Sequence, residues 1–93
     1  MGEDMPKVES VRDDIIEFVL TNFVTDFDRG SLPLDESLVE IGVLDSYAVV
    51  ELVSFLEERW SIPIPDADIT REKMGSIDKM ANLVVAILRT KSE

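Results

Sequence analysis

The chain has 93 residues, enough for one small domain, and its 20 Asp and Glu outnumber its 9 Lys and Arg, for a formal net charge of −11. It contains no Cys and no His, which excludes disulfides, thiolate nucleophiles, zinc ribbons and any catalytic triad that relies on imidazole. Such a charge repels nucleic-acid phosphates, and no apolar run is long enough to span a membrane. The first ten residues lack the apolar stretch of a secretory signal, so we expect a cytoplasmic protein.

The apolar pattern predicts a first helix over residues 10–24, with Ser10 as its N-cap. Apolar side chains spread beyond one stripe, so we expect this helix to be covered on more than one side. The predicted stripe is Val11, Ile15, Phe18, Val19 and Asn22, widened by Ile16, Leu20 and Phe23.

Residues 25–44 contain turn-forming Gly30, Pro33 and Gly42, but apolar residues are spaced through the segment. A structureless loop of this length is unusual in a compact domain. We therefore expect a long crossover that lies against the helices, with one helical turn near residues 36–39.

A second long helix is predicted over residues 46–60. Asp45 is its natural N-cap, accepting from the N–H of Tyr47 or Ala48, and two prolines at 63 and 65 prevent its continuation. Phe55 lies between its two faces, and both a place on the outer surface and packing against the third helix stay open. The predicted inward stripe is Val49, Leu52, Val53, Leu56 and Trp60.

The last third of the chain predicts a short helix near residues 66–72, ended by Gly75, and a final helix over residues 76–88 capped by Ser76. No segment alternates with the period of a strand. The fold class is therefore all-α, a small bundle of three long helices and one short helix, with a long crossover between the first two. We expect a single domain over residues 1–93, structured from about 8 to 88 between short flexible termini. The inward face of the last helix is Ile77, Met80, Ala81, Val84, Ile87 and Leu88.

The residues around Ser46 carry the functional signal. Ser46 falls in the first turn of the second helix, directly after Asp45 and shortly after Gly42. Helix N-termini carry unpaired N–H groups and partial positive charge, so they favour a phosphate even in an acidic protein. An Asp-Ser pair alone, however, indicates ordinary capping far more often than a modified serine.

The wider segment resembles the attachment site of acyl carrier proteins and the related peptidyl and D-alanyl carriers. The resemblance rests on Gly42, Asp45-Ser46-Tyr47 and Glu51-Leu52, and it continues through residues 56–58 and 62–66 to the last helix. It covers roughly residues 8–88 and implies a four-helix bundle of acyl-carrier type. It also implies that a phosphopantetheinyl transferase moves 4′-phosphopantetheine from coenzyme A to the Ser46 hydroxyl, which makes the chain a phosphoprotein, with Asp45 helping to hold the transferase's magnesium.

The resemblance further implies that the arm's thiol holds an acyl or aminoacyl group as a thioester, and that the chemistry belongs to partner enzymes. Those partners would be a loading ligase and downstream transferases or synthases of fatty acid, polyketide, peptide or lipid-modifying pathways. We expect a monomer that is not itself an enzyme. The alternative function is an unmodified, carrier-like acidic interaction subunit.

Three departures from the usual pattern lie at the start of the second helix. Tyr47 stands where Leu, Met or Ile is usual, and Ala48 stands where fatty-acid carriers often have an acid. The spacing before Ser46 is closer to D-alanyl and other specialised carriers. These departures leave the identity of the partners open.

Two surfaces of the second helix are candidates for binding. Its outward side predicts a docking patch in which acids meet basic partner surfaces; this patch is Tyr47, Val50, Glu51, Ser54, Glu57 and Glu58. Its inward side and the segment that follows it predict an apolar slot for cargo, with ordinary core packing of the same residues as an equal alternative. The slot is Val49 and Val53 of the helix, with Ile62, Ile64, Ile69 and Met74 of the following segment.

Two other functions are disfavoured by the residues. Ser46 is not in a Gly-x-Ser-x-Gly elbow and no His can activate it, so autonomous catalysis is not expected. Loops that begin at Asp26 and Asp66 lack the Gly and Glu that an EF-hand needs at its sixth and twelfth positions, so no metal site is expected.

Overall fold

A computed structural model describes residues 6–23 and 26–92 of the chain. Its elements are α1 (Val8–Asn22), α2 (Ser46–Trp60), the 3₁₀ turn η1 (Asp66–Asp68), α3 (Arg71–Met74) and α4 (Ile77–Ser92). The predicted fold class is confirmed, since these elements are four α-helices and a 3₁₀ turn, with no strand in the described ranges. None of the helices in those ranges has the length and apolar content to cross a bilayer.

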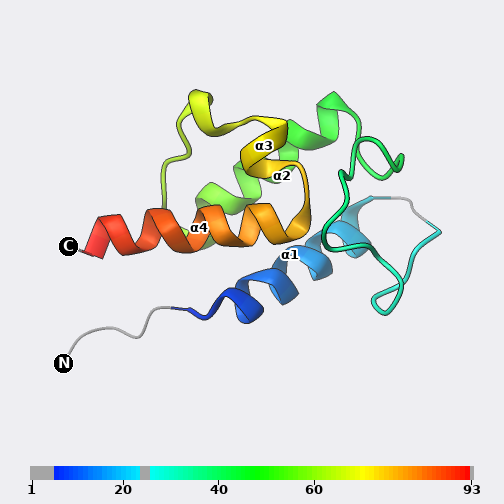
Figure 1. The fold of residues 1–93 in the computed structure, drawn as a ribbon, viewed down its shortest axis with the longest axis horizontal. Coiled ribbons are helices and arrows are strands. Elements are labelled where there is room, and N and C mark those ends of the chain that lie inside the picture. The colour runs from blue at the N-terminus through cyan, green and yellow to red at the C-terminus, as the bar shows by residue number, and fades with distance from the viewer. Residues whose placement is uncertain (1–5, 24–25, 93) are drawn as a thin grey trace.

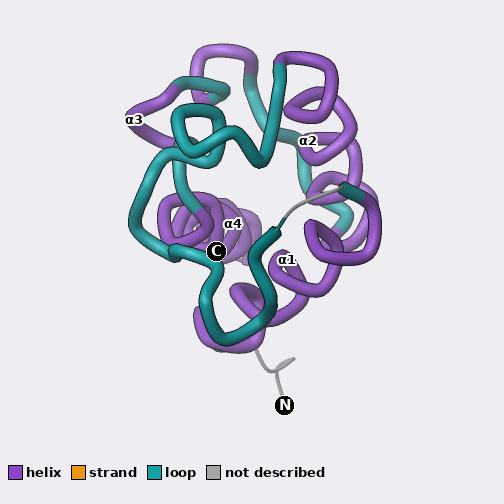
Figure 2. The backbone as a smooth tube through the Cα atoms, turned by 90° about the vertical axis from the view of Figure 1, so that its right-hand side faces the viewer, coloured by secondary structure: helices purple, strands orange, loops and turns teal. Residues whose placement is uncertain are grey.

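The frame of the molecule is the antiparallel pair α1 and α4, which lie side by side with α2 and α3 stacked on them (Figures 1 and 2). Val11 and Ile15 on α1, with Met80 and Val84 on α4, are at most 1% exposed and form the centre of the core. Burying each such side chain contributes about 1.5–3 kcal/mol. The other elements therefore pack on this pair of helices.

The start of α1 lies earlier in the chain than predicted. The helix begins at Val8 after an extended Lys7 that provides no side-chain cap, so the predicted capping role of Ser10 is wrong and Ser10 lies within the first turn. Asn22, expected on the inward stripe, is exposed and its Nδ2 donates to the Phe18 carbonyl at 2.9 Å. The predicted end at residue 24 falls outside the described residues.

Burial on α1 does spread over more than one side of the helix, as expected. Ile16 is buried beside the main stripe, and Leu20, Phe23 and Phe18 are partly buried against the same core. The helix is therefore covered both by α4 and by side chains of α2.

The predicted long crossover is present and packs against the helices, although residue 25 lies outside the described ranges. Leu32 and Leu38 are buried in the core. The Leu38 N–H donates to the Gly75 carbonyl at 3.0 Å, and the Asp78 N–H donates to the Leu34 carbonyl at 2.9 Å. The crossover is thus fastened to the start of α4 and the end of α3 by its own backbone.

The helical turn expected near residues 36–39 lies slightly later and is a single turn over residues 37–42. The Ile41 N–H donates to the Ser37 carbonyl at 3.0 Å. Gly42 then adopts a φ of +83°, a left-handed conformation in which a helix cannot continue. The turn therefore ends at Gly42.

The bounds of α2 agree with the prediction, but its buried face is rotated. The buried side chains are Ala48, Leu52 and Leu56. Val49, Val53 and Trp60, which were expected in the inward stripe, are only partly buried. These three still pack against the core, but at the edge of the buried face, because the packing of Phe55 on Phe18 of α1 turns the centre of that face toward Ala48 and Leu52.

An aromatic cluster joins the second half of α2 to α1. The ring of Phe55 stacks on Phe18 with centroids 4.1 Å apart, and Trp60 meets Phe55 edge-on at 5.9 Å. Arg59 lies over the Trp60 ring, 5.2 Å from its centroid, and its Nη2 pairs with Asp14 Oδ2 at 2.9 Å. Phe55 therefore packs against α1, and neither an outer position nor packing against the third helix describes it.

The short helix predicted over residues 66–72 is two separate turns, η1 and α3. Thr70 between them is extended, and its Oγ1 accepts from the Lys73 N–H at 3.1 Å, so it caps a new helix and interrupts the old one. Gly75 ends α3 as predicted. The Ser76 cap is confirmed, since its Oγ accepts from the Lys79 N–H at 3.2 Å.

The last helix continues beyond residue 88 to Ser92. Its expected face is confirmed over the first half, where Ile77, Met80, Ala81 and Val84 are buried; Ile87 and Leu88 are partly buried.

Candidate functional site

Asp45 fixes the start of α2. It is extended, with φ −110° and ψ −177°, and its Oδ1 accepts from the Ala48 N–H at 2.8 Å. The predicted cap is therefore present, with Ala48 as the donor. The cap makes Ser46 the first helical residue, and its side chain is exposed.

The end of α2 has the properties that a phosphate attached to Ser46 requires. The N–H groups of Ala48 and Val49 donate to Asp45, so those of Ser46 and Tyr47 are directed out of the helix end. They add to the partial positive charge of the helix terminus, which stabilises an anion there. The exposed hydroxyl and these two N–H groups together fit a phosphodiester.

Exposed apolar side chains gather on the segments next to Ser46. Within the described residues, three large apolar side chains are strongly exposed: Tyr47 at 79%, Val50 at 63% and Val39 at 53%. Tyr47 and Val50 were predicted on the docking face, whereas Val39 was missed because the crossover has no periodicity that assigns faces. We call these three residues the apolar patch.

The predicted acids of the docking face differ in their environment. Glu51 and Glu58 are exposed, as is Ser54. Glu57 is half-buried, and its Oε2 accepts from the Ile64 N–H at 2.9 Å. One oxygen of its carboxylate therefore holds the segment after α2 in place.

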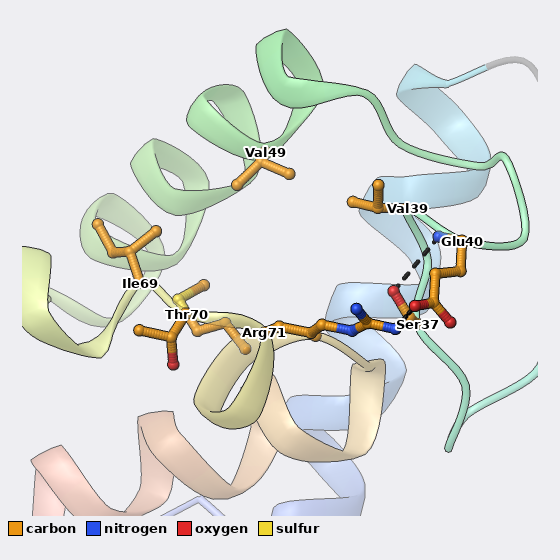
Figure 3. A pocket seen from close by; sticks show the side chains of 9 residues that line it. Ser37, Val39, Glu40, Val49, Ile69, Thr70 and Arg71 are labelled. Atoms are coloured by element: carbon orange, nitrogen blue, oxygen red, sulfur yellow. Dashed lines mark hydrogen bonds and ion pairs between the residues drawn. The ribbon is translucent and has the colours of Figure 1, made fainter.

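A cavity of about 240 Å³ lies between α2, α3 and the crossover turn (Figure 3). Its apolar walls are Val39, Val49, Ile69 and Met74. Glu40 and Arg71 also line it, and they form an ion pair between Glu40 Oε2 and Arg71 Nη2. The remaining lining residues are Ser37, Thr70 and Gly75.

The structure thus brings three of the six predicted slot residues to one cavity: Val49, Ile69 and Met74. Ile62 and Ile64 are 3% and 5% exposed and belong to the core instead. They alternate with exposed prolines in an extended segment, so both point to the same, inner side. Val53 is partly buried against the core and is not among the residues that line this cavity.

Comparison with known proteins identifies the family of the chain. No model of a known protein family matches the chain. The D-alanyl carrier protein of Streptococcus suis (strain 98HAH33) is 33% identical over 78 residues, which are 84% of this chain and 95% of that protein. The D-alanyl carrier proteins of Streptococcus sanguinis (strain SK36) and Streptococcus thermophilus (strain CNRZ 1066) are 31% and 32% identical over 77 residues, 83% of this chain and 94% of each relative. The family resemblance predicted from the sequence is therefore confirmed, and the chain belongs to the carrier protein family that includes the D-alanyl carrier proteins.

Proposed function

We propose that this carrier protein holds its cargo as a thioester on a 4′-phosphopantetheine arm attached to Ser46. The observation that supports this most is the exposed Ser46 hydroxyl at the first position of a capped, 15-residue helix. The arm would supply the thiol that this chain lacks. Ser46 Oγ would bond the phosphorus of the arm, and the N–H groups at the helix end would stabilise the phosphate charge.

Asp45 has two roles in this proposal. Its Oδ1 caps the helix and so fixes the direction of the serine side chain. A carboxylate has a second oxygen with lone pairs of its own, and Oδ2 would contribute to the magnesium site of a phosphopantetheinyl transferase.

Partner enzymes would dock on the apolar patch and the acids beside it. Tyr47 and Val50 supply apolar contact area within one helical turn of the arm, and Glu51 and Glu58 would attract basic partner surfaces. Ser54 and the half-buried Glu57 complete this face. The partners would be the transferase, a loading ligase and the enzymes that receive the cargo. They would supply all catalysis, and the chain would act as a monomer in the cytoplasm.

An aminoacyl cargo, and D-alanyl in particular, is favoured over a fatty acyl chain. The relatives are named D-alanyl carrier proteins.

The experiment that tests the proposed function is modification in solution. We expect the protein, incubated with a broad-specificity phosphopantetheinyl transferase, coenzyme A and magnesium, to gain the mass of one arm. The Ser46→Ala variant should gain nothing. Ser10→Ala, which removes an exposed serine of α1 that is not part of this face, should be modified like the wild type.

A second function is favoured by the apolar patch, which any binding partner could use. An unmodified interaction subunit would expose the same three side chains without needing Ser46. Failure of the wild type to gain mass with several transferases would replace the carrier function with this one.

A further inference from the structure

The first two turns of α2 carry a ring, an aliphatic side chain and a carboxylate that are all exposed. These are Tyr47, Val50 and Glu51, and Glu51 follows Tyr47 by four residues of the helix. Residues at this spacing are neighbours on a helix surface, with Cβ atoms about 5–6 Å apart. Helical side chains lean toward the N-terminus, so the carboxylate of Glu51 extends toward the Tyr47 ring. The ring and the carboxylate therefore form one surface element, with Val50 beside it.

The ring and the carboxylate have no partner within the part of the chain that the structure describes. Tyr47 is 79% exposed, and within residues 6–23 and 26–92 its ring contacts no other ring and Glu51 forms no ion pair. Residues 31–60 contain seven acids and a single base, Arg59. Arg59 pairs with Asp14 of α1, so it does not neutralise the start of α2. The two groups are open to a cation from another molecule.

The other end of the same helix shows how this protein holds a guanidinium. Arg59 lies over the ring of Trp60, 5.2 Å from its centroid, and its Nη2 pairs with Asp14 Oδ2 at 2.9 Å. One guanidinium thus contacts an aromatic face and a carboxylate together. Tyr47 and Glu51 supply the same two groups without the cation. A guanidinium suits them better than an ammonium, because it is planar, stacks on rings and is more weakly hydrated.

We propose, on the basis of the proposed function, that Tyr47 and Glu51 together bind one arginine side chain of a docking partner. The guanidinium lies on the Tyr47 ring and donates to the Glu51 carboxylate, while the aliphatic stem of the arginine contacts Val50. The charge of Glu51 attracts arginine and lysine alike, so Tyr47 is the residue that distinguishes them. The partner surface that meets the start of α2 therefore carries arginine.

The test titrates the unmodified protein with two end-blocked tripeptides, Gly-Arg-Gly and Gly-Lys-Gly, which carry the same charge. NMR spectra follow the ring signals of Tyr47 and the methyl signals of Val50. We expect the arginine peptide to shift both sets of signals at a several-fold lower concentration than the lysine peptide. Equal concentrations for the two peptides, or no shift with either, would overturn the proposal.

Four variants separate the ring from the charge. Tyr47→Leu keeps an apolar side chain but removes the ring, so the preference for the arginine peptide should disappear, as measured on Val50. Tyr47→Phe keeps the aromatic face and should keep the preference. Glu51→Gln should weaken the binding of both peptides, whereas Glu9→Gln, which removes an exposed acid of α1, should bind them like the wild type. A preference for arginine that survives Tyr47→Leu would contradict the proposal.

A transferase assay tests whether the ring and the carboxylate hold the same side chain. Tyr47→Leu and Glu51→Gln should each raise the KM for the carrier several-fold, and the double variant should raise it by less than the product of the two. Fully multiplicative effects would overturn the proposal, while the gain of mass on Ser46 would still support the carrier function. An arginine preference in a protein that gains no mass would support the arginine site and overturn the carrier function.

Discussion

The two ends of α2 have opposite surroundings. At its C-terminal half, Phe55 stacks on Phe18, Arg59 pairs with Asp14, and Glu57 accepts from the Ile64 backbone. At its N-terminal end, Tyr47 and Val50 are exposed and Ser46 points to solvent. One 15-residue helix is therefore packed against α1 at one end and exposes large apolar side chains at the other.

This difference separates stability from function along a single element. Side chains of the anchored half contribute to the free energy of unfolding, because their apolar area is removed from water. The exposed side chains of this free end, Tyr47 and Val50, contribute little to folding, whereas Ala48 between them is buried in the core. Substitutions at the two ends should therefore affect different measurements.

The largest effect is expected at the anchored half. Leu56 is fully buried, and Leu56→Ala should lower the free energy of unfolding by about 2–5 kcal/mol through lost burial and a residual cavity. Chemical denaturation measures this change. Val50→Ala, at the free end of the same helix, is the matched control and should stay within about 0.5 kcal/mol of the wild type. Equal losses of unfolding free energy in the two variants would contradict the difference between the two ends of α2.

An intermediate effect is expected at the Asp45 cap. Asp45→Ala should lower the free energy of unfolding by about 1 kcal/mol, because the Ala48 N–H loses its acceptor. The same variant should be modified more slowly by a transferase. Asp45→Asn, which keeps the capping oxygen, should recover most of the stability but not the rate. If Asp45→Asn recovered both the stability and the modification rate, Asp45 would act only as a helix cap.

A smaller effect, confined to kinetics, is expected for Glu51. Glu51→Lys should slow association with a phosphopantetheinyl transferase several-fold at low salt and leave the melting temperature almost unchanged. The difference should shrink as salt is added, since exposed charges are screened. If the wild type and Glu51→Lys associated with the transferase at the same rate at low salt, Glu51 would not take part in docking.

The smallest effect is expected in the crossover, at Asp28. Hydrogen bonds from the Ser31 side chain, and then from the Ser31 and Gly30 N–H groups, hold the pKa of the Asp28 carboxyl below its usual range. The folded chain thus takes up this proton at lower pH than the unfolded chain. The resulting stabilisation is present above the unfolded pKa and is lost as pH falls through the folded one.

Ser31→Ala should therefore raise the pKa of Asp28 toward that of an ordinary aspartate, as an NMR titration would measure. An unchanged pKa of Asp28 would show that the backbone N–H groups alone lower it.

The features that sequence predicted well are those with local causes. The bounds of α2 follow from the Asp45 cap and the prolines after Trp60, and the start of α4 follows from Ser76. The start of α1 could not be predicted, because Lys7 caps it with backbone geometry alone and Ser10 has the chemistry of a cap.

The features that sequence missed depend on contacts between distant segments. The stacking of Phe55 on Phe18 rotates the buried face of α2, and nothing local in either helix indicates it. Glu40 and Arg71 are far apart in the chain, so their pairing at the cavity could not be predicted from the motif around Ser46. The capped helix start at Ser46 was predictable because the cap, Asp45, directly precedes it in the sequence.

The most direct test of the central claim is the intact mass of the protein purified from the cells that produce it. We expect a species heavier than the unmodified chain by one phosphopantetheine group, with or without cargo, and fragmentation that places the added mass on Ser46. A chain that carries no added mass, in cells with an active transferase, would contradict the carrier function.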